Sequence, residues 1–368
     1  MSKPRILFSV PTRHHVEIAL DELEGMQKLG YPCEQFQYAA KDGVSSKTGR
    51  LRVIVQNALS LVKTARKFKP DVIYFNSRLE VLAGIRDFIT IVICKTLYRQ
   101  KVHFVIKSHG SAIEVLGHQT GLFNKVVLPF LKENIAGWLF LSTEEQKKVI
   151  ETGYLEADKI FVTKNIVRTD QFSIDAGFRS KLGISNNQQL LLFVGRLIKE
   201  KGIYEVVKAF AEVAEQYQEC TLIIVGWGSE LEELKSVARS LNIAQRVIFT
   251  GFIAEAEVVS YYSNCDILVF PTYFPEGFPM ALFNSVAAGM SIITTPTRAA
   301  TDYLTEPDNC LWVEPQNIKS VSSALQQLLQ SHQLLNSMKQ KNIAKGIEFS
   351  QNRVAGELSE IIKQITRK

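Results

Sequence analysis

The sequence predicts an α/β protein with two doubly wound domains, each built around a parallel sheet. Along most of the chain, short runs of apolar and often β-branched residues alternate with longer amphipathic segments, which is typical of βαβ units. The alternation starts again at residue 189, after a polar stretch at 165–176 that suggests a linker. With 368 residues, of which 46% are hydrophobic, the chain can bury two cores. Ligands are expected in a cleft between the domains, because open sheets bind them at the carboxyl ends of their strands.

The first domain is predicted over residues 1–170 as a Rossmann-like domain. Apolar runs bounded by turn residues predict its strands at 5–10, 71–75, 102–107, 137–141 and 159–162. Segments with apolar residues at helical spacing predict helices at 16–29, 52–68 and 143–151.

The second Rossmann-like domain is predicted over residues 171–348. Its strands are expected at 189–194, 221–225, 246–249, 266–270 and 291–294. Its helices are expected at 203–217, 230–241 and 279–288. From Ile318 onward the pattern is entirely helical, and residues 349–368 are expected to form a separate C-terminal helix.

Composition excludes several classes of protein. The 21 Gly, 11 Pro and 22% charged residues do not fit collagen-like or disordered chains. The five cysteines are widely spaced, which argues against a zinc site or a disulfide framework and for a reducing compartment. No apolar run approaches the ~20 residues that span a bilayer, and the first residues do not resemble a signal peptide. We therefore expect a cytoplasmic protein.

Positive charge is concentrated in the first half of the chain. Residues 1–170 contain 25 Lys and Arg against 17 Asp and Glu, a balance of +8, whereas the remainder contains 18 against 20. Residues 41–107 alone contain 14 basic and 4 acidic residues. Such a region suits an anionic partner, such as a membrane surface, a phosphorylated acceptor or nucleic acid, although a solvated lysine-rich helix face explains it about as well. No basic stretch is interleaved with aromatic residues as in RNA-binding proteins, so nucleic acid is not expected as a partner.

The segment Gly195-Arg196-Leu197-Ile198-Lys199-Glu200-Lys201-Gly202 joins a predicted strand to a predicted helix. Gly195 permits a turn, and Arg196 and Lys201 place two cations at the carboxyl edge of the second sheet, where packing does not require them. Paired cations can stabilise the negative charge that develops on a diphosphate leaving group. The alternative is that both are ordinary surface cations, but their position at the carboxyl edge of the sheet makes that interpretation less favoured.

The most specific segment is 271–285. In it, Glu276-Gly277-Phe278 precedes a helix in whose first turn Pro279 fits. The free N–H groups of a helix N-terminus suit phosphate or sugar hydroxyls. Glu276 can accept hydrogen bonds from sugar hydroxyls, and Gly277 allows the chain to approach a ligand closely. A carboxylate that only stabilises the helix would explain Glu276 but not the whole segment.

Two further signals are weaker. Gly226-Trp227-Gly228 follows a predicted strand, but Leu231 stands where a dinucleotide-binding fingerprint needs its third glycine, so we interpret it as a tight turn that also lines a site. Ser108-His109-Gly110 follows the strand predicted at 102–107, and His109 is as readily structural as functional. The sequence has no Asp-x-Asp pair, no Gly-x-Ser-x-Gly elbow and no Walker-type Gly-Lys-Ser/Thr. We therefore expect no metal and no cofactor, and protein cations must serve any diphosphate.

Taken in order, these motifs resemble the family-4 retaining glycosyltransferases of the GT-B fold (glycosyl transferases group 1). The resemblance covers roughly residues 190–300. It rests on Gly195-Arg196-Leu197, Lys201-Gly202, Gly226-Trp227-Gly228, Gly251-Phe252, Glu276-Gly277-Phe278-Pro279 and Ala287-Ala288-Gly289, with His109-Gly110 and Asn165 in the first half.

The resemblance implies transfer of a sugar from a nucleoside-diphosphate sugar, with retained anomeric configuration and without a metal. It implies that Arg196 and Lys201 hold the diphosphate, and that Glu276 and the backbone amides after it hold the donor sugar. His109 would contact that sugar from across the cleft, which makes His109 and Glu276 the implied catalytic residues. The implied donor-binding residues are Gly195, Arg196, Lys201, Gly228, Phe252, Ile253, Gly277, Phe278, Pro279 and Asn284, with Phe252 and Ile253 near the base. The terminal helix would pack back on the first domain, which would bind the acceptor.

The chain departs from the family pattern at two places. Members usually carry a second Glu eight positions after the first, thought to bind the ribose, and this chain has Asn284 there. An amide still makes hydrogen bonds but loses their charge-assisted strength. The usual Gly-Gly loop of the first domain is replaced by Pro11-Thr12-Arg13-His14-His15, in which Arg13 and His14 are candidate acceptor contacts.

The expected function is that of a cytoplasmic hexosyltransferase-type glycosyltransferase that acts on a saccharide or lipid-linked acceptor in surface polysaccharide or glycolipid assembly. The basic region at 41–107 would favour peripheral association with the inner face of a membrane. Two alternatives remain: a GT-B sugar-nucleotide epimerase, and a non-catalytic sugar-nucleotide-binding or partner subunit, which Asn284 suggests.

Overall fold

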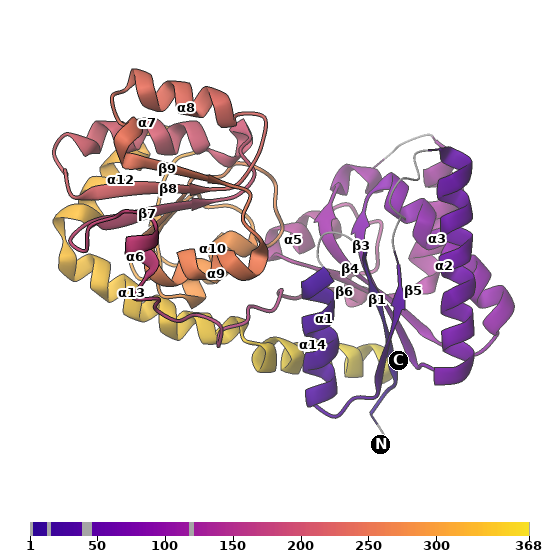
Figure 1. Cartoon of the computed structure of the whole chain (residues 1–368). Coiled ribbons are helices and arrows are strands. Elements are labelled where there is room, and N and C mark those ends of the chain that lie inside the picture. The colour runs from indigo at the N-terminus through magenta and orange to yellow at the C-terminus, as the bar shows by residue number, and fades with distance from the viewer. Residues whose placement is uncertain (1–2, 13–15, 39–45, 118–120, 368) are drawn as a thin grey trace. The chain divides into compact units, whose positions relative to one another are not determined.

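The computed structural model describes residues 3–12, 16–38, 46–117 and 121–367. It divides the chain into two compact units (Figure 1). The first unit consists of Met1–Ile166 and Gln351–Lys368, and the second of Val167–Ser350. These divisions lie four residues before the boundary expected at 170 and two residues after the one expected at 348. Within the described residues, none of the helices is both long and apolar enough to cross a lipid bilayer.

The first unit is a six-stranded parallel sheet with helices on both faces. The strand order is β2-β1-β3-β4-β5-β6. The strands are β1 (Ile6–Val10), β2 (Cys33–Gln37), β3 (Val72–Leu79), β4 (His103–Ser111), β5 (Ile135–Phe140) and β6 (Ile160–Val162). The helices are α1 (Val16–Lys28), α2 (Lys47–Phe68), α3 (Val81–Tyr98), α4 (Leu128–Asn134), α5 (Thr143–Glu151) and α14 (Gln351–Arg367).

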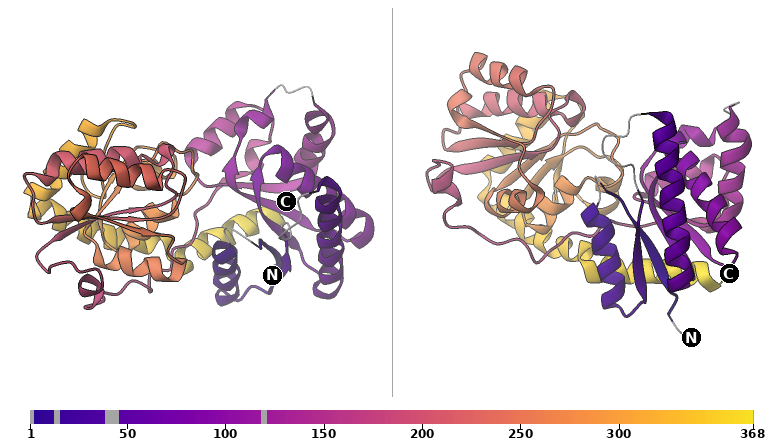
Figure 2. Two further views of the ribbon diagram at one scale, coloured as in Figure 1. Left: turned by 45° about the horizontal axis from the view of Figure 1, so that its top comes forward. Right: turned by 45° about the vertical axis from the view of Figure 1, so that its right-hand side comes forward.

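Alternation along the strands divides the buried residues of this unit between two cores. Leu7 packs with residues of α2 to α5, whereas its neighbours Ile6 and Phe8 pack with residues of α1 and α14. This is the period of two that a strand covered on both faces imposes. Figure 2 shows α14, the last helix of the chain, beside α1 on the first sheet. The terminal helix therefore belongs to the first unit, although the second unit precedes it in sequence.

The second unit repeats this architecture with the order β12-β11-β10-β7-β8-β9, again all parallel. The strands are β7 (Gln189–Val194), β8 (Cys220–Val225), β9 (Val247–Gly251), β10 (Ile267–Phe270), β11 (Ser291–Thr294) and β12 (Leu311–Trp312). The helices are α6 (Phe178–Lys181), α7 (Ile203–Ala214), α8 (Leu231–Ser240), α9 (Glu255–Asn264), α10 (Met280–Ala287), α11 (Ala299–Tyr303), α12 (Ile318–Gln330) and α13 (His332–Gly346).

Several elements differ from the sequence-based prediction. No element was predicted for β2, α3, α9 or β12. The strand expected at 102–107 continues to Ser111, because Ser108 and Ser111 still pair with β3 across a shift in register. His109 therefore lies within β4 and not after it. The helix expected to begin at Pro279 begins at Met280, with Pro279 in an extended conformation as its N-cap.

The strand orders locate the reversal points of both sheets. In the second sheet, β7 lies between β10 and β8, so the chain proceeds to one edge through β8 and β9 and to the other through β10, β11 and β12. In the first sheet the corresponding reversal lies between β1 and β3. Open α/β sheets bind ligands outside the carboxyl ends of the strands at such a reversal. A ligand site is therefore expected at the loops after β7 and β10.

Candidate functional site

Close backbone contacts hold the loop after β7 against the loop after β8. A Cβ atom added at Gly226, whose φ is +149°, would lie 1.9 Å from the carbonyl oxygen of Gly195. A Cβ added at Gly228 would lie 2.2 Å from the carbonyl oxygen of Leu197. The amide of Leu197 in turn donates to the carbonyl of Trp227 over 3.1 Å. The glycines of the Gly-Trp-Gly sequence are therefore required by the backbone that they face.

The loop after β7 is joined in the same way to the loop after β10. Gly202 has φ +72°, and a Cβ there would lie 2.3 Å from the carbonyl oxygen of Pro271. The carbonyl of Glu200 accepts hydrogen bonds from the amide of Tyr273 at 2.9 Å and from Oγ1 of Thr272 at 3.3 Å. Three loops that are far apart in sequence thus form one connected rim at the reversal point.

At this rim Lys201 and Glu276 form an ion pair. The Lys201 side chain is 4% exposed and that of Glu276 is 29% exposed, so the pair has a buried ammonium and a carboxylate that reaches solvent. Burial lowers the pKa of Lys201, the nearby Glu276 carboxylate opposes that effect, and the Arg196 charge adds to it. The sequence predicted both residues in one site, and the structure brings them into contact.

Arg196 is exposed, and its guanidinium lies 4.7 Å from the centre of the Phe274 ring. The ammonium of Lys201 lies 5.0 Å from the same ring. Phe274 therefore contacts both cations, and such contacts favour positive charge over an aromatic face. Arg196 has no ion-pair partner among the residues that the structure describes, so its charge is available to an anionic ligand.

The loop after β10 leads into α10, and its Phe278 side chain belongs to an aromatic cluster. The ring of Phe278 stacks on that of Phe283 with centres 3.7 Å apart, and both rings contact Tyr303 and Phe349. Gly277, Phe278 and Pro279 are all buried. The side chains of Phe278 and Pro279 thus anchor the loop, and the parts of this segment suited to a ligand are the backbone amides at the start of α10.

The loops after β8 and β9 carry exposed aromatic side chains. Trp227 is 68% exposed and Phe252 is 79% exposed. Their loops follow adjacent strands, and the amide of Gly226 donates to the carbonyl of Gly251 over 3.0 Å. Gly228 and Ile253 are partly buried beside them. Exposed rings on this rim provide flat apolar surfaces suited to a planar group.

Asn284 lies on α10, eight residues after Glu276, and is partly buried. Its side chain forms a hydrogen bond with the hydroxyl of Tyr262, which is buried on α9. Burial raises the pKa of Tyr262, and the hydrogen bond from Asn284 opposes this rise. Asn284 therefore has a partner within the second unit.

In the first unit, His109 is held at the carboxyl end of the central strands. Its Nε2 lies 2.8 Å from Oδ1 of Asn76 on β3. Asn76 donates through Nδ2 to the carbonyl of Ser9 over 3.1 Å, and its backbone N–H donates to Oγ of Ser9 over 2.7 Å. These contacts fix the imidazole from three adjacent strands. Arg13 and His14, the candidate acceptor contacts, lie outside the described residues.

Sequence reasoning missed Asn76, Tyr262 and Phe274. Asn76 had a usable signal, since an Asn directly after four buried apolar residues in a central strand requires a hydrogen-bond partner. Phe274 and Tyr262 had none, because their partners depend on how separate loops and helices meet.

Most of the second unit matches a known protein family. Residues 176–345 match the family model of glycosyl transferases group 1. The chain is 36% identical over 115 residues to the alpha-monoglucosyldiacylglycerol synthase of Streptococcus pneumoniae, which corresponds to 31% of this chain and 26% of that protein. The chain spans 26% to 59% of the length of the first curated relatives that it matches.

Solved structures match the whole chain. A glycosyltransferase from Rickettsia africae superposes with a TM-score of 0.79 at 17% identity, with all of both chains covered. HepE of Anabaena, solved in complex with UDP and glucose, superposes with a TM-score of 0.74 at 18% identity over 98% of this chain and 99% of that one. Residues 176–345 are therefore similar to the group 1 glycosyl transferases, and the chain as a whole has the two-domain GT-B fold.

Proposed function

We propose that this chain is a retaining glycosyltransferase, which moves a sugar from a nucleoside-diphosphate sugar to a saccharide or lipid-linked acceptor. The observation that carries the proposal is the connected rim at the reversal point of the second sheet, which combines an exposed Arg196 with the Lys201–Glu276 pair. The group 1 match over this unit and the glycolipid synthase among its relatives support the reaction class. The structural neighbour solved with UDP and glucose supports a nucleotide-sugar donor.

In this proposal the rim binds the donor in two parts. Arg196 donates to the diphosphate and stabilises the charge that develops there as the sugar–phosphate bond breaks. Lys201 orients the Glu276 carboxylate, whose exposed side accepts hydrogen bonds from sugar hydroxyls. Trp227 and Phe252 offer surfaces on which the base can stack.

Retention of configuration requires that the acceptor attack from the face that the diphosphate leaves. In that geometry the leaving phosphate oxygen can take the acceptor's proton, so no further protein base is needed. His109, fixed by Asn76, would contact the donor sugar and orient it for this attack. Positive charge from Arg196 replaces the divalent cation that many diphosphate reactions use, and we propose that no metal takes part.

We propose that the first unit, which would bind the acceptor, associates with an anionic membrane. Helix α2 contains six basic residues and no acidic one, and its residues Leu51 and Leu59 are 49% and 48% exposed. These leucines are eight residues, or about two turns, apart, and exposed leucines on a helix rich in Lys and Arg are typical of helices that lie on anionic bilayers. The double variant Leu51→Glu/Leu59→Glu should lose co-sedimentation with anionic vesicles, whereas Leu241→Glu, directly after α8, should not. Equal binding of both variants would contradict this part of the proposal.

The first test is a thermal-shift panel of UDP, GDP, ADP and CDP with their sugar conjugates, with and without EDTA. A ligand at 100 times its Kd stabilises the folded state by about 2.7 kcal/mol, which moves the melting temperature measurably. We expect one nucleotide to raise the melting temperature. This shift should be unchanged by EDTA and lost in Arg196→Ala. Lys199→Ala, which removes a charge from the same loop, should keep the shift. Product analysis by NMR should then show the donor's anomeric configuration retained.

No shift with any nucleotide would contradict the proposal. The non-catalytic subunit that Asn284 suggests would then be favoured, and Asn284→Glu should in that case create nucleotide binding. A donor that is consumed without any acceptor would instead favour the epimerase.

A further inference from the structure

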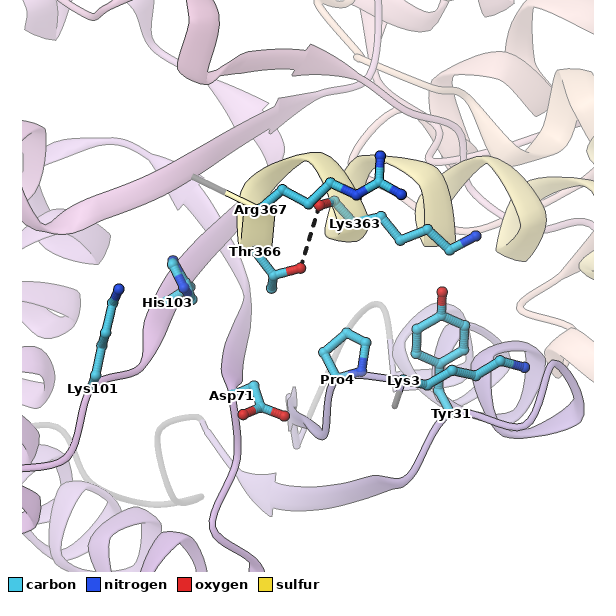
Figure 3. Close-up of a pocket in the computed structure, with 9 residues that line it drawn as sticks. All are labelled: Lys3, Pro4, Tyr31, Asp71, Lys101, His103, Lys363, Thr366 and Arg367. Carbon is cyan, nitrogen blue, oxygen red and sulfur yellow. Dashed lines mark hydrogen bonds between the residues drawn. The ribbon is translucent and has the colours of Figure 1, made fainter. Parts of the chain in front are cut away.

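A cavity of about 870 Å³ lies in the first unit, at the end of the sheet opposite to the one that His109 occupies (Figure 3). Its floor is formed where β1, β3 and β4 begin, with Pro4, Asp71 and His103 at those ends. The last turn of α14 covers it with Thr366 and Arg367. Neither the family resemblance nor the proposed donor site involves this region.

The charge of the lining is strongly positive. Its basic residues are Lys3, Lys101, Lys363 and Arg367, against the single acid Asp71. Lys3 donates to the carbonyl of Leu29, and Lys363 donates to Oε1 of Glu360 over 2.6 Å, so both ammonium groups have a partner within the protein. Lys101 and Arg367 have no hydrogen-bond or ion-pair partner among the residues that the structure describes.

A buried hydroxyl at the same cavity also lacks a partner. Tyr31 is 4% exposed, and within the described part of the chain its hydroxyl makes no hydrogen bond. A buried hydroxyl without a partner costs free energy, and a bound ligand is one of the ways in which proteins satisfy such groups. Figure 3 shows this hydroxyl pointing toward α14, the helix that carries Lys363.

The positive groups lie on different sides of the cavity. In Figure 3, Lys101 and His103 lie on one side of the cavity and Tyr31 on the other, and Lys363 and Arg367 both project from α14 above them. Cations on more than one side of a cavity suit an anion that carries more than one charged group. The cavity also has the size of small-molecule sites, which are about 300–1,000 Å³.

We propose that this cavity binds an organic compound that carries two or more phosphate groups, held by Lys101 and Arg367 and by the Tyr31 hydroxyl. Arg and Lys are the usual protein ligands of phosphate, and the rings of Tyr31 and Pro4 form an apolar wall for the organic part. The phosphates can belong to a free metabolite or to lipid headgroups, since both present the same chemistry. This site is independent of the proposed donor site, because it uses no residue of the second unit.

Binding of inorganic tripolyphosphate tests the proposal. Calorimetry is performed on the full chain carrying Arg196→Ala, so that the second unit contributes no anion site. The pocket variant is Lys101→Ala/Arg367→Ala. The control is Lys147→Ala/Arg353→Ala, which removes the same charge from exposed positions of the same unit, one of them on α14 itself. We expect binding at low ionic strength that weakens at least tenfold in the pocket variant and is unchanged in the control.

Tyr31→Phe separates a built site from general attraction to positive charge. It removes one hydroxyl and no charge, so weaker binding in this variant supports a site and unchanged binding contradicts it.

Co-sedimentation with phosphatidylglycerol vesicles, compared with phosphatidylcholine vesicles, identifies the source of the phosphates. Loss of vesicle binding in the pocket variant alone supports the site and assigns the phosphates to lipid headgroups. Equal effects of the pocket and control variants on both probes, or no binding of either probe, would overturn the proposal.

Discussion

At the scale of single residues, Arg196 and Lys201 are both basic residues of one loop, but they differ in burial. Arg196 is exposed and stacks on Phe274, whereas Lys201 is buried and paired with Glu276. Their substitutions should therefore have different consequences for stability. An exposed cation can be removed at little cost to the fold, while an unpaired buried ammonium is costly.

We expect Glu276→Ala to lower the free energy of unfolding by about 1–3 kcal/mol. This is less than for a fully buried pair, because the carboxylate reaches solvent. Arg196→Ala should leave stability unchanged but weaken nucleoside-diphosphate binding by about 10- to 100-fold, as loss of a hydrogen bond to a charged group does. Thermal melting without ligand and calorimetry with the nucleotide measure the two effects separately. A large loss of stability in Arg196→Ala would contradict the assignment.

The imidazole of His103 provides a test at the other end of the first sheet. Burial and the nearby Lys101 lower its pKa, and Asp71 opposes them. Because the folded protein then binds fewer protons than the unfolded chain, this residue reduces stability as the pH falls from about 6.5 through the folded pKa. Histidine NMR titration should give a pKa below the usual value, and Lys101→Ala should raise it. Lys147→Ala, which removes a distant charge, should not. A bound polyphosphate should raise this pKa as well.

The sequence predicted the residues of the second unit's site better than those of the first. Arg196, Lys201 and Glu276 lie on loops directly after strands, where the carboxyl edge of a parallel sheet brings separate segments together. That Lys201 is buried while Arg196 is exposed could not be predicted, because it depends on the rings of Phe270 at the end of β10 and of Phe274 in the loop after it. The partner of His109 likewise depends on the register between β3 and β4.

At the scale of elements, the loops after β7 and β8 are joined by backbone contacts that leave no room for a side chain. We expect Gly226→Ala to destabilise the protein, since the new Cβ would lie 1.9 Å from a carbonyl oxygen in a backbone conformation that only glycine adopts readily. It should also abolish nucleotide binding, because Arg196 lies on the displaced loop. Gly356→Ala is the control. It lies on α14 with no atom within 4 Å of the added Cβ, and should raise stability by up to about 1 kcal/mol. Thermal melting of the three proteins decides, and equal melting of Gly226→Ala and the parent would contradict the close contact.

Three of the elements that the sequence did not predict, α3, β2 and β12, each have a physical reason for being missed. Helix α3 buries polar Asp87 and Thr90 on its inner face and exposes Leu82 and Leu97 on the other, so its apolar residues show no clear helical period. Strand β2 lies at the edge of the sheet with one buried residue, Phe36, and its polar residues do not read as a strand. Strand β12 has only two residues. The regular strands were predicted because burial on both faces makes them short apolar runs, and the amphipathic helices α1, α5, α7 and α8 because one face of each is buried.

At the scale of the whole molecule, the first unit is built from two separate parts of the chain. Helix α14 contributes Ala355, Leu358, Ile362 and Ile365 to the core that contains Ile6 and Phe8 of β1. It approaches its neighbours closely: a Cβ on Gly25 of α1 would lie 2.9 Å from that of Ala355, and one on Gly137 of β5 would lie 2.4 Å from Ile365. The glycines at these points permit the helix to pack on the sheet and on α1.

Ending the chain after Ser350 should therefore unfold the first unit and leave the second one folded. The deletion removes the apolar side chains that α14 buries beside α1 and exposes the part of the first sheet that they cover. Burial of each large apolar side chain stabilises a protein by about 1.5–3 kcal/mol, so the lost helix outweighs the stability of a typical domain. The second unit, Val167–Ser350, keeps its six strands and their covering helices intact. Amide hydrogen exchange should show β1 and β3 losing protection while β7 and β8 keep it. Retained protection in β1 would show that the first unit folds without α14, and loss of protection in β7 would show that the two units fold only together.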